Sequence, residues 1–93
     1  MRTISYSHRF KRDYRREKSA LLGKKLDELL REALELLVVD GSLPARFVDH
    51  ALTGEWKDHR DCHIRPDLIL IYRKPTDDSL ELVRLGSNSE LGL

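Results

Sequence analysis

Seven apolar side chains between residues 26 and 38 recur at the spacing of a single α-helical face. The set is Leu26, Leu29, Leu30, Ala33, Leu34, Leu37 and Val38. Charged residues occupy the opposite face, so the stretch predicts an amphipathic helix that ends near Asp40 and Gly41. Such a helix is stable only when its apolar stripe is covered, and the rest of the chain must therefore supply a second layer.

The C-terminal half supplies this layer as β-strands. Residues 68–73 are aliphatic or β-branched at nearly every position, which is typical of a central strand covered on both faces. Turn signals at Pro66-Asp67 and at 75–78 separate this strand from strands expected at 59–65 and 80–85. In the last strand we expect Leu80, Leu82 and Arg84 on one face. Two successive hairpins predict an antiparallel meander.

The N-terminus predicts a short strand followed by a basic helix. Residues 3–6 alternate polar and apolar side chains, and Ser7 is a suitable cap for a helix over residues 8–19. The expected fold is α+β, with two N-terminal helices packed on one face of a small antiparallel sheet of about four strands. All 93 residues fit one domain, and we expect residues 86–93 to cross an exposed face as a tail.

The net charge of +1 conceals a strong asymmetry. Residues 1–25 hold nine Lys or Arg and two acids, whereas residues 26–93 hold eight bases and fourteen acids. A basic block of this density is typical of a surface that binds a polyanion, although a solvated helix face has the same composition. The single cysteine, Cys62, and a longest apolar run of five residues predict a cytoplasmic protein without membrane contact.

Three of the four histidines, His50, His59 and His63, fall within fourteen residues. On a helix, His59 and His63 would share a face as zinc ligands, but Pro66 and the adjacent turn favour a strand. Strand alternation then places His59, Asp61, His63 and Arg65 on one face. We therefore expect neither a metal nor a cofactor.

A strand face that carries acid, imidazole and guanidinium groups suits chemistry on a phosphodiester. Histidine can take or give a proton near neutral pH, and Arg65, Arg84 or Lys57 would supply positive charge. For each residue alone the competing interpretation is an ordinary solvent-facing side chain. Trp56 is more typical of a core residue than of a base-stacking residue, and Cys62 of a small buried side chain.

Two stretches of the chain resemble a known family. Residues 49–72 resemble the motif DHxLxGxWxxxRDxHxxPDxxLIY of YafQ-type toxins, which belong to the RelE superfamily of bacterial toxin–antitoxin systems. Residues 84–91 are similar to the ending RxGxHxxLF of the same family. The basic first helix and the leucine-rich second helix also fit, so the resemblance covers essentially the whole chain and implies a RelE-like fold.

The resemblance implies a ribosome-dependent endoribonuclease that cuts messenger RNA in the ribosomal A site without a metal. The ribose 2′-hydroxyl would attack the adjacent phosphorus and leave a 2′,3′-cyclic phosphate. His50, His63 and Asp67 match catalytic positions of the family, with Asp61 in support and either histidine as the general base. The cations expected to contact RNA or its phosphates are Arg84, Arg65 and Lys57 together with the first-helix residues Arg9, Lys11, Arg12, Arg15 and Arg16.

The chain departs from the family motif at two positions. Asn88 replaces the histidine that is the usual candidate general acid, and Gly92 replaces an aromatic residue. An amide does not donate a proton as an imidazolium does, so we expect weakened cleavage. A basic, non-catalytic RNA- or ribosome-binding module is the alternative function.

The implied partners are the ribosome, messenger RNA and a cognate antitoxin of the ribbon-helix-helix type, similar to DinJ or RelB. Contact with operator DNA would be made only through the antitoxin.

Overall fold

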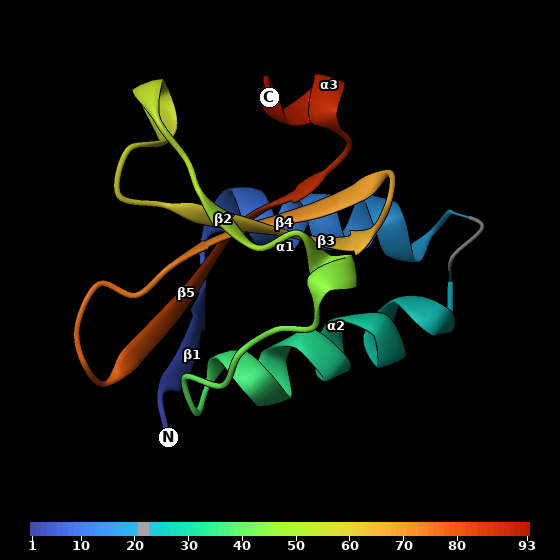
Figure 1. The fold of residues 1–93 in the computed structure, drawn as a ribbon. Helices are drawn as coiled ribbons and strands as arrows, with labels where there is room; N and C mark the ends of the chain where they lie inside the picture. Colours follow the sequence, from blue (N-terminus) through green and yellow to red (C-terminus); the bar gives the residue numbers. More distant parts are fainter. Residues whose placement is uncertain (21–22) are drawn as a thin grey trace.

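The computed structural model describes residues 1–20 and 23–93, within which five strands form one sheet (Figure 1). The strands are β1 (Thr3–Tyr6), β2 (His50–Ala51), β3 (Arg60–Arg65), β4 (Leu68–Arg73) and β5 (Ser79–Gly86). The helices are α1 (His8–Lys18), α2 (Lys25–Leu37) and α3 (Asn88–Leu91), with short 3-10 turns η1 (Ala45–Phe47) and η2 (Gly54–Trp56).

The sheet is mixed, with the strand order β1-β5-β4-β3-β2. Strands β2 to β5 pair antiparallel, as the two predicted hairpins require, but β1 pairs with β5 in parallel. The prediction of about four antiparallel strands was therefore wrong in detail. The chain between β1 and β5 runs through α1, α2 and strands β2 to β4, a connection long enough to allow parallel pairing. Strand β2 has only two residues, too few to show a period.

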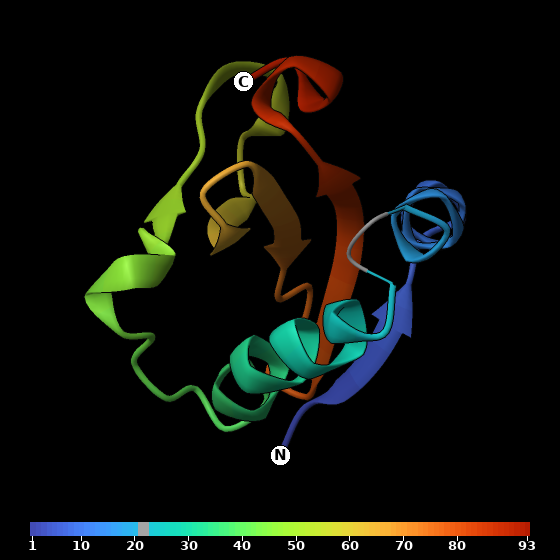
Figure 2. The same cartoon turned by 90° about the vertical axis from the view of Figure 1, so that its right-hand side faces the viewer.

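One face of the sheet carries the main core. The apolar stripe of α2 and Phe10 of α1 pack there against side chains such as Leu70, Leu82 and Leu85. Figure 2 shows α2 crossing this face while α1 lies beside β1 and β5. Strand β4 is central in the order and is buried over its first five residues, which confirms the interpretation of residues 68–73 as a covered strand.

Helix α3, which follows β5 in the chain, covers part of the opposite face of the sheet. Leu91 is buried against Ile69 and Ile71, and Trp56 packs beside them. The side chain of Ser87 accepts from the backbone N–H of Glu90, whose carboxylate accepts from the N–H of Ser87, so that α3 begins with a capping box. The C-terminal segment lies across this face, as expected, but it forms the short helix α3 with Leu91 buried where a tail was predicted.

Bulges in two strands change which side chains share a face. Ile71 pairs with Arg84 and Tyr72 with Leu82, so Val83 is an extra residue in β5. Leu85 therefore joins Leu80 and Leu82 in the main core, and the predicted grouping of Arg84 with these leucines was wrong. Arg84 instead pairs with Ile71, which faces α3.

The second bulge lies in β3, where His63 pairs with Ile69 and Arg65 with Leu68. Ile69 faces α3, whereas Leu68 belongs to the main core. Arg65 is thereby turned away from the face of Asp61 and His63, contrary to the expected alternation.

None of the helices in the described residues has the length and the apolar composition that a membrane-spanning helix needs.

Candidate active site

A pocket of about 600 Å³ brings together four of the predicted site residues, namely His50, Asp61, His63 and Asn88. His50 comes from β2 and is the register partner of Asp61 in β3. His63 lies two residues further along β3, and Asn88 is the first residue of α3. Residues from three elements thus meet on the sheet face that α3 covers.

Asp61 is the most buried polar group of the pocket, with 2% of its surface exposed. Burial raises the pKa of this carboxyl, and the charges of His50 and His63 oppose the rise. Within the described residues, Oδ1 of Asp61 receives no hydrogen bond, although Nδ1 of His50 lies 2.8 Å away.

The surroundings of His50 define its neutral tautomer. Nδ1 lies 3.0 Å from the carbonyl oxygen of Val48 in addition to its contact with Asp61. A carbonyl oxygen only accepts hydrogen bonds, so Nδ1 must carry the proton. Nε2 then has its lone pair free to accept a proton from a group bound in the pocket.

Trp56 forms a wall between this pocket and a smaller one of about 390 Å³. Its Nε1–H donates to the carbonyl of Leu91 at 3.2 Å, and its ring meets that of His59 edge-on at 5.4 Å. His59 therefore packs on Trp56, outside the lining of the larger pocket. In the described part of the chain, no group of three or more His, Cys, Asp or Glu side chains is arranged to hold a metal ion.

Arg84 lines the smaller pocket together with Arg9, and its guanidinium is already bound to Asp13. Nε donates to Oδ2 of Asp13 at 2.7 Å and Nη2 donates to Oδ1 at 3.2 Å. Arg84 is thus beside the larger pocket, and Asp13 fixes its orientation.

Asp67, Arg65 and Lys57 also lie outside the lining of the larger pocket. Asp67 is exposed in the turn between β3 and β4, Arg65 is exposed beyond the β3 bulge, and Lys57 is exposed after η2. The motif predicts the spacing of these residues in the sequence. The turn after β3 and the bulge in β3 determine where Asp67 and Arg65 lie.

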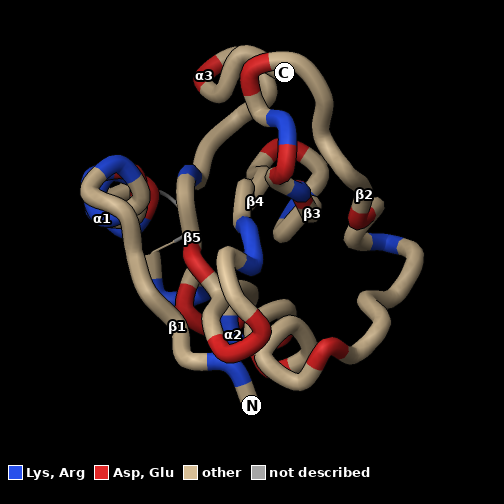
Figure 3. Tube along the Cα trace, turned by 90° about the vertical axis from the view of Figure 1, so that its left-hand side faces the viewer, with Lys and Arg blue, Asp and Glu red and all other residues tan. Residues whose placement is uncertain are grey.

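The basic residues of α1 differ in their surroundings, and Figure 3 shows that Lys and Arg positions (blue) recur along this helix. Lys11 and Arg15 line a groove towards α2, and Arg12 is exposed. Arg16 bonds to Asp13, Glu17 and the carbonyl of Leu85. The predicted RNA-contact set is therefore divided between exposed and internally paired cations.

Sequence reasoning did not assign Asp13, Asp49, Trp56 or Tyr72 to the site. Asp49, Trp56 and Tyr72 belong to the motif over residues 49–72, and this membership was the available signal. Asp13 had none, because an acid on a basic helix normally faces solvent. Cys62 is fully buried as expected, and burial raises the pKa of its thiol to about 12.

Comparison with known proteins gives consistent relatives. Residues 2–92 match the family model described as the bacterial toxin of the type II toxin–antitoxin system, YafQ. The mRNA interferase toxin YafQ of Escherichia coli K12 is 40% identical over 91 residues, covering 97% of this chain and 95% of that protein.

Solved structures show the same fold. A copper-bound mutant toxin from Helicobacter pylori has a TM-score of 0.85 at 41% identity, with 98% of this chain and 99% of the other covered. YafQ in the DinJ–YafQ complex of E. coli has a TM-score of 0.78 at 34% identity, with 98% of each chain covered. The chain belongs to the YafQ family of bacterial toxins of type II toxin–antitoxin systems.

Proposed function

We propose that this toxin is an endoribonuclease that cleaves messenger RNA in the ribosomal A site, and that the 93 residues act as one toxin domain in the cytoplasm. The observation that carries the proposal is the meeting of His50, Asp61 and His63 in one pocket. Support comes from the E. coli relatives, which are named mRNA interferase toxins. The reaction needs no cofactor, because an imidazole and the substrate's own hydroxyl suffice.

His50 is the proposed general base. Its Nε2 takes the proton of the ribose 2′-hydroxyl as that oxygen attacks the adjacent phosphorus. The bond to the 5′-oxygen of the next nucleotide then breaks and leaves a 2′,3′-cyclic phosphate. Asp61 stabilises the imidazolium ion that forms, as a carboxylate behind a catalytic histidine does in other enzymes. His63 lies in the same pocket and would contact a non-bridging phosphate oxygen.

The departing 5′-oxygen requires a proton, and Asn88 occupies the position from which a histidine would give it. An amide can hydrogen-bond to this oxygen without protonating it. General acid catalysis typically contributes about 10² to 10⁴ in rate, so we propose that cleavage by this chain is weaker by a factor in that range.

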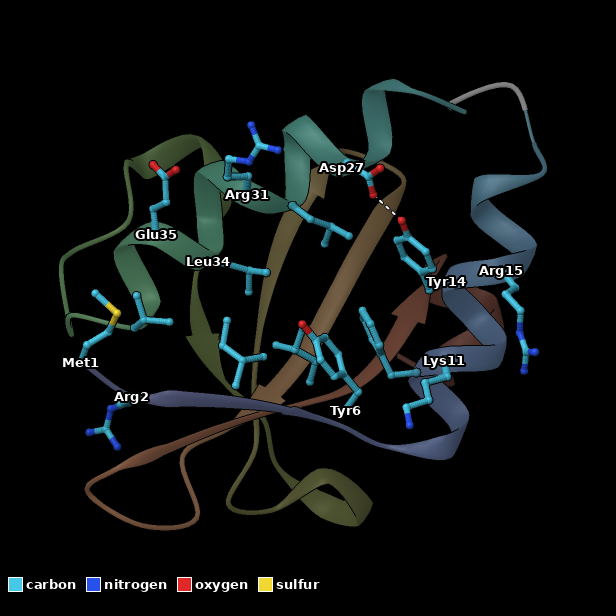
Figure 4. Close-up of a pocket in the computed structure, with 15 residues that line it drawn as sticks. Met1, Arg2, Tyr6, Lys11, Tyr14, Arg15, Asp27, Arg31, Leu34 and Glu35 are labelled. Atoms are coloured by element: carbon cyan, nitrogen blue, oxygen red, sulfur yellow. Dashed lines mark hydrogen bonds between the residues drawn. The ribbon is translucent and has the colours of Figure 1, made fainter.

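An antitoxin is the proposed occupant of a groove of about 990 Å³ between β1, α1 and α2 (Figure 4). Apolar side chains such as Ile4, Phe10 and Leu34 line it. The cations Arg2, Lys11, Arg15 and Arg31 also line it. This combination suits an amphipathic segment with acidic flanks that folds on binding. DinJ–YafQ complexes are known for E. coli, and operator DNA would be bound through the antitoxin.

The test is cleavage by the Asn88→His variant on ribosomes programmed with a defined message. We expect 2′,3′-cyclic phosphate ends with Asn88→His and far fewer with the unchanged chain. Ribosome binding without such ends, even with Asn88→His, would contradict the enzyme and favour a binding module. Ends formed equally by both proteins would contradict the role of residue 88.

A further inference from the structure

Asp49, directly before His50, is held by two strands. The hydroxyl of Tyr72 in β4 donates to Oδ1 of Asp49 at 2.5 Å, and Nη2 of Arg60 in β3 donates to Oδ2 at 3.1 Å. Tyr72 is only 1% exposed, so its hydroxyl lies inside the protein. Burial and the bond to Asp49 both raise the pKa of Tyr72, which keeps it a donor.

Val48, directly before Asp49, has a backbone conformation that is rare for its residue type. Its φ of 47° and ψ of 45° lie in the left-handed region, which a β-branched residue seldom adopts. Such a conformation persists only where the surroundings hold it in place. The flanking residues do so, because Phe47 is buried in the core and Asp49 is bonded to Tyr72 and Arg60.

This turn places the carbonyl oxygen of Val48 at 3.0 Å from Nδ1 of His50. We propose that Asp49, anchored by Tyr72 and Arg60, is a positioning residue that holds the Val48 turn and thereby fixes His50 as the Nδ1–H tautomer. The consequence for RNA cleavage rests on the proposed function, whereas the tautomer itself does not. We call the contacts of Asp49 with Tyr72 and Arg60 the Asp49 clamp. It gives a structural role to Asp49 and Tyr72, which lie at the two ends of one motif.

The chain offers two matched controls. His59 also has its Nδ1 3.0 Å from the carbonyl of the residue two positions earlier, Lys57, but lies outside the Asp49 clamp. Glu81 accepts from Nε of Arg73 at 2.6 Å, and the two side chains are 25% and 44% exposed. The corresponding values for Asp49 and Arg60 are 26% and 45%, so the two cross-strand ion pairs are equally exposed.

The first experiment is nitrogen-15 NMR of the histidine rings in the full chain at a pH where they are neutral. We expect His50 as the Nδ1–H tautomer in the unchanged protein. With Tyr72→Phe and with Asp49→Asn it should become a mixture of tautomers. His59 should not change in either variant, and His50 should not change with Glu81→Gln. A His50 tautomer that is the same in all four proteins would overturn the proposal.

The second experiment measures cleavage in the Asn88→His background. We expect Asp49→Asn and Tyr72→Phe to lower kcat about tenfold or more with KM nearly unchanged, because the base is displaced while RNA contacts remain. Glu81→Gln should leave both unchanged. Equal kcat in all variants would overturn the proposal. If Asn88→His itself does not cleave while the tautomer shifts as expected, the proposed function fails and the positioning role stands.

Val48→Gly separates positioning from stability. Glycine adopts the left-handed conformation without strain, and Val48 is 54% exposed, so little packing is lost. We expect a melting temperature equal to or above that of the unchanged protein, together with a less fixed His50 tautomer and a lower kcat in the Asn88→His background. A lower melting temperature with an unchanged tautomer would overturn the account of the turn.

Discussion

The carboxylate of Asp13 in α1 and the guanidinium of Arg84 in β5 are 71 residues apart in sequence, yet Oδ2 and Nε lie 2.7 Å apart. The same carboxylate accepts from the backbone N–H of Leu85 and from Arg16, each at 3.0 Å. Arg16 also lies 3.5 Å from Glu90 in the capping box of α3. This cluster joins α1 to the end of β5, from which α3 and residue 88 extend.

Asp13 should stabilise the fold in a pH-dependent way. Burial opposes ionisation, but hydrogen bonds from Arg84, Leu85 and Arg16 outweigh it and lower the pKa of Asp13. A carboxyl whose folded-state pKa is lowered stabilises the protein above its unfolded pKa, and this contribution is lost as the pH falls through the folded pKa. Asp13→Asn should cost about 3 kcal/mol at pH 7, because Arg84 loses a buried partner.

Urea unfolding of both proteins between pH 7 and pH 2 measures this contribution. The difference in the free energy of unfolding should be constant above about pH 5 and should shrink below about pH 4. A difference that is independent of pH would contradict the role of the ionised carboxylate.

The capping box of α3 should affect both stability and cleavage. Ser87→Ala removes the acceptor for the N–H of Glu90, and loss of such a cap typically costs about 1 kcal/mol. Residue 88 is the first residue of this helix, so kcat in the Asn88→His background should fall in parallel. Thermal unfolding and ribosome cleavage assays check the two effects. Loss of stability with unchanged kcat would show that the cap of α3 does not contribute to catalysis.

Binding to the ribosome or to RNA should depend on salt through the exposed cations of α1. Arg12 is exposed, whereas Arg16 bonds to Asp13 and Glu17. Arg12→Gln should therefore reduce the slope of log affinity against log salt by about one, as expected for one phosphate contact. Arg16→Gln should lower stability and leave the slope nearly unchanged. Equal slopes in all three proteins would exclude Arg12 from the RNA surface.

The groove of Figure 4 should bind the antitoxin. Leu34→Asp places a charge among its apolar side chains, and we expect antitoxin affinity to fall at least tenfold because that charge would be desolvated on binding. Glu28→Gln, an exposed position of α2 outside the groove lining, is the control. Calorimetry with the purified antitoxin checks the difference, and equal affinities would show that the antitoxin occupies another surface.

Much of the fold could be predicted because the spacing of apolar residues along the chain indicates which side chains are buried. The α2 stripe, the covered strand β4 and the Ser7 cap all follow from local patterns. The parallel pairing of β1 could not be predicted, because an edge strand's own sequence does not state its partner or direction. Helix α3 has only four residues, which is too short for a period.

The site was predictable to a similar extent. Strand alternation predicted that Asp61 and His63 share a face. His50 entered the site only through the resemblance to the YafQ motif, because β2 has two residues and shows no period. The bulge in β3 turned Arg65 away, and bulges have no simple sequence pattern. Asp13 was missed because its burial depends on Arg84, which is distant in sequence.

The most direct test of the central claim is the rate at which cyclic phosphate ends form on programmed ribosomes in the Asn88→His background, with and without His50→Gln. Removal of the general base should lower the rate by about 10² to 10⁴ while ribosome affinity remains. An unchanged rate after His50→Gln would show that His50 does not take the proton from the 2′-hydroxyl.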